Sequence, residues 1–174
     1  MHFVPTDIEG CVVVRPERHE DARGHFARTW DGAELAAGGV DPAVAQCSVS
    51  YNHTAGTLRG MHFQAAPHAE SKLVRCTRGA VFDVCLDLRA GSPTFRRWHG
   101  ETLSAENGVA LVVPEGCAHG FLTLEDATEV FYMISAPYAP DAGRGVRWDD
   151  PAFGIDWPGE VRVIHPRDAG YALV

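Results

Sequence analysis

Short strand-like runs separated by turn residues fill almost the whole chain and constrain its fold more than any other feature. Turn signals such as Ala90-Gly91-Ser92-Pro93 and Glu106-Asn107-Gly108 separate the runs at hairpin spacing. Only residues 31–37, which are followed by Gly38 and Gly39, show a helix-like pattern. The expected strands are residues 11–15, 25–30, 57–64, 72–76, 81–88, 97–103, 109–113 and 128–135. This pattern predicts an all-β sandwich or barrel with a few short helices.

The composition is that of an ordinary globular protein. The chain has 174 residues, of which 45% are hydrophobic and 22% are charged. It can therefore bury a sizeable core, and we expect a single domain that spans residues 1–174. No apolar run approaches the roughly 20 residues that cross a bilayer, and the N-terminus lacks the features of a signal peptide. We expect a cytoplasmic protein without a membrane partner.

Charge and cysteine content narrow the possible functions. The net charge of −8 argues against a nucleic-acid partner, although a local group of basic residues can still attract a small anionic substrate. The five cysteines are odd in number, widely scattered and without a Cys-x-x-Cys pair. They are expected to be reduced core residues rather than a disulfide framework.

The alternation of side chains along the strands places several ionisable groups on faces that can line a barrel. In residues 81–88 one face is continuously apolar, and the other mixes apolar residues with two aspartates. The ionisable or polar side chains on such faces are His62, Gln64, Lys72, Asp83, Asp87 and Tyr132. If these faces line the interior, the cavity holds acid–base groups in a partly apolar chamber, where pKa values can be tuned.

Two short segments each place one histidine at the edge of an apolar, strand-like run. They are Arg59-Gly60-Met61-His62-Phe63-Gln64 and Pro114-Glu115-Gly116-Cys117-Ala118-His119-Gly120. The second resembles Pro-x-Gly-x-x-His, the later signature of the cupin β-barrel, and the first stands where metal-binding cupins have His-x-His. Here Gln64 stands two residues after His62, where His-x-His would have its second histidine, so the histidine pair is absent. We therefore expect a cupin-type antiparallel β-barrel, a jelly roll, that performs acid–base chemistry with no metal and no cofactor.

A metal site is the main alternative for these histidines. His62, His68, Glu70 and His119 can be drawn as a set of four ligands. However, His68 and Glu70 follow a turn at Pro67, where regular strand alternation ends. A transition-metal site needs three or four ligands in fixed geometry, which a turn does not readily supply. A Cys117–His119 nucleophile is also disfavoured, because nothing nearby would activate the thiol.

Nine segments follow one another along the chain in the order and spacing of a known family. They are residues 21–24, 58–64, 72–76, 79–84, 92–95, 103–107, 114–121, 147–151 and 154–158. Together they resemble the dTDP-4-dehydrorhamnose 3,5-epimerases, the deoxysugar epimerases within the cupins. The resemblance implies an epimerase that inverts C3, C5 or both in a 4-keto-6-deoxyhexose linked to a nucleotide diphosphate.

The resemblance also implies a role for individual residues. His62 matches the general base, Asp168 the carboxylate that orients it, and Tyr132 the general acid on the opposite face of the sugar. Lys72 and His119 match residues that contact the sugar and stabilise the enolate. The matches for nucleotide and phosphate contacts are Arg23, Gln46 and Arg59, and Tyr138 matches the aromatic residue that stacks on the base. This set agrees with the chemistry, because proton abstraction next to a ketone needs a base, an electrophile and an acid across the ring.

Departures from the family pattern surround the expected nucleotide and sugar positions. The family often has Asn where this chain has Ser48 and Lys where it has Arg167, and both positions are expected to contact substrate. The substrate specificity is therefore open. Two other classes of protein also stay possible: a metal-dependent cupin oxygenase or isomerase, and a non-catalytic sugar-binding cupin.

We further expect a homodimer, as the resemblance implies. The apolar strand at residues 11–14 is expected to form a sheet edge that needs covering.

Overall fold

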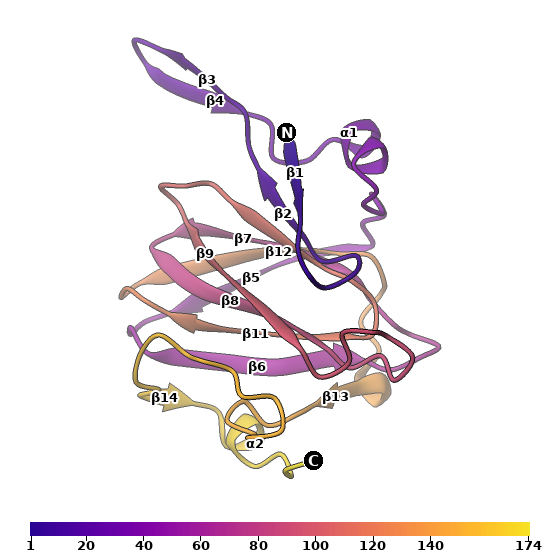
Figure 1. Ribbon diagram of the computed structural model, residues 1–174. Coiled ribbons are helices and arrows are strands. Elements are labelled where there is room, and N and C mark those ends of the chain that lie inside the picture. The colour runs from indigo at the N-terminus through magenta and orange to yellow at the C-terminus, as the bar shows by residue number, and fades with distance from the viewer.

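The computed structural model describes residues 1–174 and shows two β-sheets packed face to face (Figure 1). The strands are β1 (His2–Pro5), β2 (Val12–Arg15), β3 (Arg18–Asp21), β4 (Gly24–Ala27), β5 (Gln46–Asn52), β6 (Thr57–Gln64), β7 (Lys72–Arg78), β8 (Ala80–Asp87), β9 (Trp98–Ser104), β10 (Ala110–Val113), β11 (Cys117–Thr123), β12 (Thr128–Ile134), β13 (Gly143–Gly145) and β14 (Val163–Ile164). The helices are α1 (Gly32–Ala37), the 3-10 turn η1 (Pro140–Ala142) and α2 (Pro166–Ala169). Neither α-helix has the length and apolar character needed to cross a membrane.

The strand order confirms the predicted all-β barrel. The first sheet runs β1-β2-β10-β7-β12-β5, and the second runs β13-β6-β11-β8-β9 with the short β14 beside β6. All neighbours are antiparallel except β14 and β6. The main core lies between the two sheets and is built from inward side chains of both, among them Val74, Val81, Leu111, Phe121 and Val130. This is the alternation expected of strands with one face on a core.

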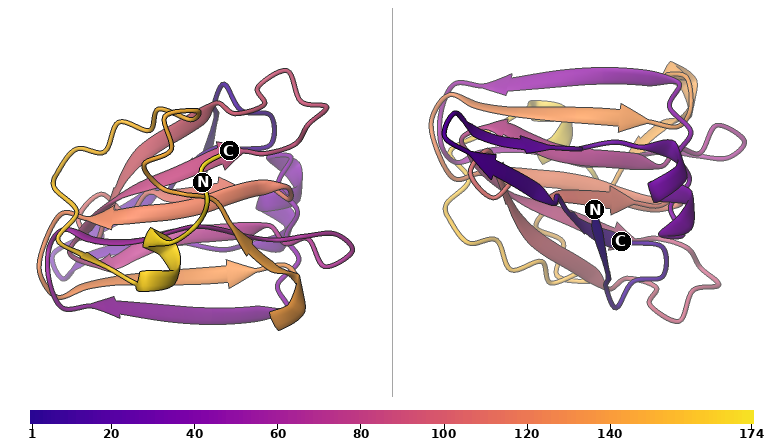
Figure 2. Two further views of the ribbon diagram at one scale, coloured as in Figure 1. Left: turned by 90° about the horizontal axis from the view of Figure 1, so that it is seen from below. Right: turned by 90° about the horizontal axis from the view of Figure 1, so that it is seen from above.

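The outer face of each sheet is covered by a different part of the chain. Helix α1 lies on the first sheet beside the N-terminal strands (Figure 2, right). Its Leu35 packs with Leu73 and Val112 of that sheet. The segment after β13 crosses the second sheet (Figure 2, left). Its Trp157 packs there and meets the Phe82 ring edge to face. These covers leave one end of the barrel interior open between the sheets.

Helix α1 forms where the sequence predicts it. The Asp31 side chain caps the first turn by accepting hydrogen bonds from the N–H groups of Ala33 and Glu34. The helix ends at Ala37 with Gly38 as its C-cap, and a Cβ on Gly38 would lie 2.6 Å from the Phe3 ring, which leaves no room there for a larger residue. The strand expected over residues 25–30 ends earlier, at Ala27, since Arg28 turns toward Asp31 and Glu34 at the start of the helix.

The prediction that residues 11–14 form a sheet edge that needs covering is wrong. Strand β2 is paired on both sides, with β1 and with β10, so its apolar residues are covered within the chain. The free edges of the first sheet are β1 and β5 instead. The β3–β4 hairpin pairs only with itself and projects away from the barrel at the top of Figure 1.

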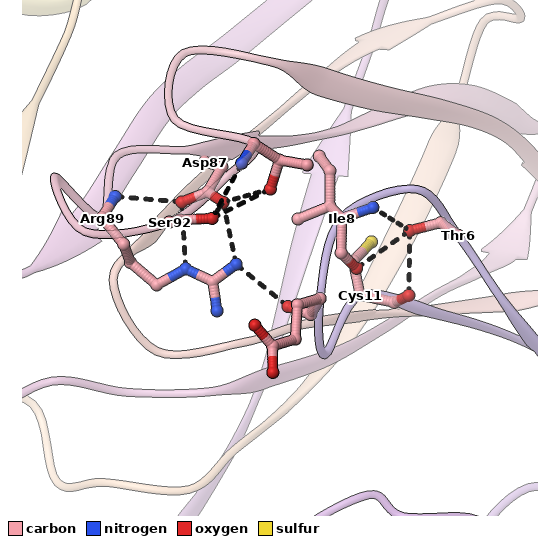
Figure 3. Close-up of polar contacts among 8 residues, drawn as sticks. Thr6, Ile8, Cys11, Asp87, Arg89 and Ser92 are labelled. Atoms are coloured by element: carbon pink, nitrogen blue, oxygen red, sulfur yellow. Dashed lines mark hydrogen bonds and ion pairs between the residues drawn. The ribbon is translucent and has the colours of Figure 1, made fainter.

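The closed end of the barrel holds Asp87, which does not face the cavity as its place in the strand pattern suggested. Its buried carboxylate accepts hydrogen bonds from Arg89, Ser92 and Thr94 (Figure 3). Burial works to raise the pKa of Asp87, but these hydrogen bonds outweigh it and hold the pKa well below its usual range. Arg89 also donates to the carbonyl of Glu9, which ties the N-terminal loop across this end of the barrel.

Two glycines bring β6 and β11 together at the open end. Gly60 has a φ of +138°, and a Cβ on it would lie 2.5 Å from the Cα of Gly120. Only glycine fits such a close approach of two backbones. Next to this contact the register pairs His62 with His119, so both histidines reach the same region.

Candidate active site

The open end of the barrel contains a cavity of about 990 Å³. Strands β5, β6, β7, β11 and β12 line it, and α2 with the segment before it closes one side. Ten of the eleven predicted site residues line the cavity: Gln46, Ser48, Arg59, His62, Lys72, His119, Tyr132, Tyr138, Arg167 and Asp168. Side chains that lie up to about 120 positions apart in the chain therefore converge on one chamber.

Arg23 is the exception. It lies at the tip of the β3–β4 hairpin, does not line the cavity and pairs with Asp21 of its own hairpin. Its side chain is 90% exposed. Within one chain, then, the structure does not bring this predicted nucleotide contact to the site.

His62 and Asp168 form a close pair on the cavity wall. The distance from His62 Nε2 to Asp168 Oδ1 is 2.8 Å, and the Asp168 side chain is only 3% exposed. Because an ionised carboxylate only accepts hydrogen bonds, the neutral imidazole carries its proton on Nε2. The other ring nitrogen, Nδ1, is then unprotonated and can accept a proton.

The surroundings of the pair favour a neutral His62 and an ionised Asp168. Burial lowers the pKa of His62, and together with the positive charges of Arg167 and Lys72 it outweighs the raising effect of Asp168. Burial also works to raise the pKa of Asp168, but hydrogen bonds from His62, Arg167 and the Gly60 N–H hold it below its usual value. Such a histidine is free to act as a base near neutral pH.

Helix α2 supplies both Asp168 and its second partner. Arg167 donates from Nε to Asp168 Oδ1 at 3.1 Å, and its Nη2 lies 3.1 Å from His62 Nε2. Since Nε2 already donates to Asp168, the guanidinium acts on the ring chiefly as a nearby positive charge. Asp168 therefore ties the base to a helix that lies far from it in the chain.

Tyr132 comes from the facing sheet. Its phenol lies inside the barrel, 3.4 Å from the Ser50 hydroxyl, and its ring meets His119 edge to face at 5.9 Å. Burial raises the pKa of Tyr132 well above its ordinary value. The phenol is therefore protonated at neutral pH and can act as a proton donor from the side opposite to β6.

His119 and Lys72 add two further polar groups to the cavity wall. His119 Nε2 lies 2.8 Å from Asp83 Oδ1, and both side chains are almost completely buried. Lys72 Nζ lies 3.1 Å from Glu70 Oε1 and 3.4 Å from the carbonyl oxygen of His62. Lys72 thus offers a cationic donor where negative charge on a bound ligand would be stabilised. His119 gives its Nε2 proton to Asp83, so its neutral ring keeps Nδ1 as an acceptor toward a ligand.

Polar and aromatic groups mark the mouth of the cavity. Arg59 is held by Asn52 Oδ1 at 2.8 Å, and Tyr138 is 70% exposed. Gln46 donates to the carbonyl of Ala136, next to the segment that carries Tyr138. An exposed aromatic ring and a fixed guanidinium that line one cavity suit a ligand with a base and phosphates.

The structure places several residues around the site that were not among the predicted catalytic and substrate-binding residues. Ser50 faces Tyr132, Asp83 pairs with His119, and Glu70 pairs with Lys72. The Tyr171 ring packs over Gly145 beside His62, where a Cβ on Gly145 would lie 2.2 Å from the tyrosine ring. The alternation of β5 could have indicated Ser50, but no local pattern connects Tyr171 with His62.

The structure does not bring His62, His68, Glu70 and His119, the alternative set of four metal ligands, together around one point. No group of three or more His, Cys, Asp or Glu side chains lies in a position to hold a metal ion. His62 and His119 each use Nε2 for a carboxylate, and Glu70 pairs with a lysine. The arrangement thus offers a base and an acid on facing sheets and the cationic donor of Lys72, a set suited to moving protons next to a carbonyl group.

Comparison with known proteins gives one consistent result. Residues 5–174 match the family model described as dTDP-4-dehydrorhamnose 3,5-epimerase. The dTDP-4-dehydrorhamnose 3,5-epimerase of Sinorhizobium fredii is 45% identical over 91% of this chain and 81% of its own length.

Comparison with solved structures points to the same family. The epimerase of that name from Bacillus anthracis, with TDP and pyrophosphate bound, has a TM-score of 0.96 at 38% identity, with 99% of each chain covered. A 3'-monoepimerase from Streptomyces bikiniensis in complex with dTDP-quinovose has a TM-score of 0.89 at 36% identity, covering 98% of this chain and 86% of its own. These matches confirm the predicted resemblance: the chain belongs to the dTDP-4-dehydrorhamnose 3,5-epimerase family.

Proposed function

We propose that residues 1–174 form one catalytic domain that inverts C3, C5 or both in a 4-keto-6-deoxyhexose linked to dTDP, as a step of deoxysugar biosynthesis in the cytoplasm. The observation that carries the proposal is the convergence of the His62–Asp168 pair and Tyr132, from facing sheets, on one cavity. Membership of the family supports this activity rather than an oxygenase or a non-catalytic sugar-binding module.

The proposed reaction moves one proton off the sugar and another onto it. His62 Nδ1 takes the proton from the carbon next to the ketone, and the C–H electron pair becomes the double bond of an enolate. The Lys72 ammonium stabilises the oxyanion, and His119 contacts the sugar from β11. Tyr132 then protonates the same carbon from the other face, which inverts it, and solvent returns both groups to their starting states. Each role follows from the protonation state that the surroundings favour or from the donors available.

The nucleotide is proposed to occupy the mouth of the cavity. Arg59 and Arg167 offer guanidinium groups for the diphosphate, and Tyr138 offers an exposed ring for the base. Gln46 and Ser48 on β5 complete this wall. The bound TDP of the Bacillus anthracis relative supports a nucleotide of this kind.

We propose a homodimer as the working form. The first sheet has a free edge at β5, on which Val49 and Tyr51 are exposed apolar residues. Arg23 is remote from the cavity of its own chain, so its predicted nucleotide contact requires a second copy. A projecting hairpin is well suited to reach a neighbouring subunit.

The direct test is proton NMR of the purified protein with dTDP-4-keto-6-deoxyglucose in deuterated water. We expect the C3 signal, the C5 signal or both to disappear as deuterium enters, together with signals of an inverted product. The same sugar linked to GDP is the matched control and should react more slowly. Absence of exchange at both carbons, in protein that binds dTDP, would refute the proposed function.

A further inference from the structure

Glu70 and Lys72 form an ion pair inside the cavity that the proposed mechanism leaves unexplained. The distance from Glu70 Oε1 to Lys72 Nζ is 3.1 Å, and each side chain is only 10% exposed. Both residues line the cavity. An enclosed ion pair of this kind gives little net stability, because removing two charges from water offsets most of their attraction. Its position on the wall of a reaction chamber points to a role in the chemistry.

The backbone on both sides of Glu70 is anchored. Gln64 donates from its side chain to the carbonyl of His68 at 3.0 Å. On the other side, the Ser71 N–H donates to Ser135 Oγ at 2.8 Å, and the Ser135 N–H donates to the Ser71 carbonyl at 3.0 Å. The short segment that carries Glu70 is therefore fixed to β6 and to the end of β12, and its carboxylate has a defined place.

The surroundings of Lys72 Nζ leave a donor for a ligand. An ammonium group has three N–H donors on a flexible four-carbon stem. The Glu70 carboxylate takes one direction around Nζ, and the carbonyl oxygen of His62, at 3.4 Å, takes a second. The remaining direction is available to the cavity that both Lys72 and His62 line.

We infer that Glu70 is a positioning residue that holds Lys72 so that its remaining N–H donor points at the ketone oxygen of the sugar. This inference rests on the proposed function. The substrate's oxyanion gains most from a donor that is already in place, because no reorganisation is then needed as charge develops. Without Glu70 the lysine side chain can sample other directions, and a displacement of about 1 Å at a reacting group can cost about 100-fold in rate.

The inference predicts a specific pattern of kinetics. Glu70→Ala should lower kcat by about 10- to 100-fold, the range expected for a misplaced donor, with dTDP affinity within about threefold of the wild type. Glu70→Gln keeps an acceptor oxygen at the same place and should recover at least about a third of the lost activity on a logarithmic scale. Glu160→Ala is the matched control, because that glutamate belongs to an exposed ion pair with Arg162.

A double-mutant cycle with Lys72→Met tests whether Glu70 acts through the lysine. If it does, Glu70→Ala in the Lys72→Met background should cause no further loss of kcat. Losses that multiply in the double variant, or dTDP affinity that falls in parallel with kcat, would overturn the inference. So would a Glu70→Ala enzyme with a wild-type kcat. An active wild-type enzyme with any of these results would leave the proposed function standing, whereas an inactive wild-type enzyme would overturn both.

Discussion

Replacing Asp168 with Asn probes the base most sharply, because it removes a charge while nearly preserving size. When His62 takes a proton from the sugar it becomes an imidazolium, which Asp168 stabilises across 2.8 Å. The carboxylate is 3% exposed, so water screens this interaction little. A hydrogen bond between charged groups is worth about 1.5–3 kcal/mol, and about 1.4 kcal/mol corresponds to a tenfold change in rate. Asp168→Asn should therefore lower kcat/KM by about 10- to 150-fold.

The pH dependence of kcat/KM gives a second test with the Asp168→Asn variant. His62 acts as a base only when neutral, so kcat/KM should rise with pH through the pKa of His62 and level off above it. Asp168 raises that pKa, while burial, Arg167 and Lys72 lower it. Asp168→Asn removes only the raising effects, so the acid limb of the profile should move to lower pH.

The assay is steady-state epimerisation of dTDP-4-keto-6-deoxyglucose from pH 5 to 9, with dTDP affinity measured by calorimetry. Affinity within about threefold of the wild type would show that the cavity is intact. The reasoning is refuted if the variant keeps kcat/KM within about threefold of the wild type, or if its acid limb moves to higher pH.

Three further predictions concern binding, metal content and assembly. Tyr138→Ala should raise KM by about tenfold or more with a smaller effect on kcat, because stacking on a base is worth about 1–3 kcal/mol; a fall in kcat alone would contradict the stacking role. Exhaustive chelation should leave turnover unchanged, whereas loss of activity that one transition metal restores would favour a metal-dependent enzyme. Light scattering at micromolar concentration should give the mass of a dimer, and the mass of a single chain would exclude the proposed role of Arg23 from a second copy.

The strands that line the core could be predicted because their alternation is strong. Residues 57–64 were expected as a strand, and β6 has the same ends. Strand β5 was missed, because its sequence Gln-Cys-Ser-Val-Ser-Tyr-Asn places small polar residues toward the cavity and resembles a loop. Strand β11 was missed because Gly120, which allows the close approach to β6, weakens the strand pattern. In β5, the polar residues that weaken the strand pattern are the ones that line the cavity.

The site was only partly accessible to reasoning from the residues. Alternation placed His62, Lys72 and Tyr132 on faces that can line an interior, and the structure puts them in one cavity. Asp168 lies 106 positions from His62, in a four-residue helix with no repeating pattern, so only the family resemblance indicated it. Asp87 was placed on the cavity face by alternation alone, but the loop that follows it supplies Arg89 and directs it to the closed end.

The division of labour between His62 and Tyr132 is the central claim, and deuterium exchange separates the two roles. Proton NMR in deuterated water should show that His62→Ala exchanges neither the C3 nor the C5 proton of dTDP-4-keto-6-deoxyglucose. Tyr132→Phe should still exchange protons through His62, with retention of configuration, while formation of inverted product is suppressed. A His62→Ala enzyme that exchanges at the wild-type rate, or a Tyr132→Phe enzyme that inverts the sugar at the wild-type rate, would contradict the account.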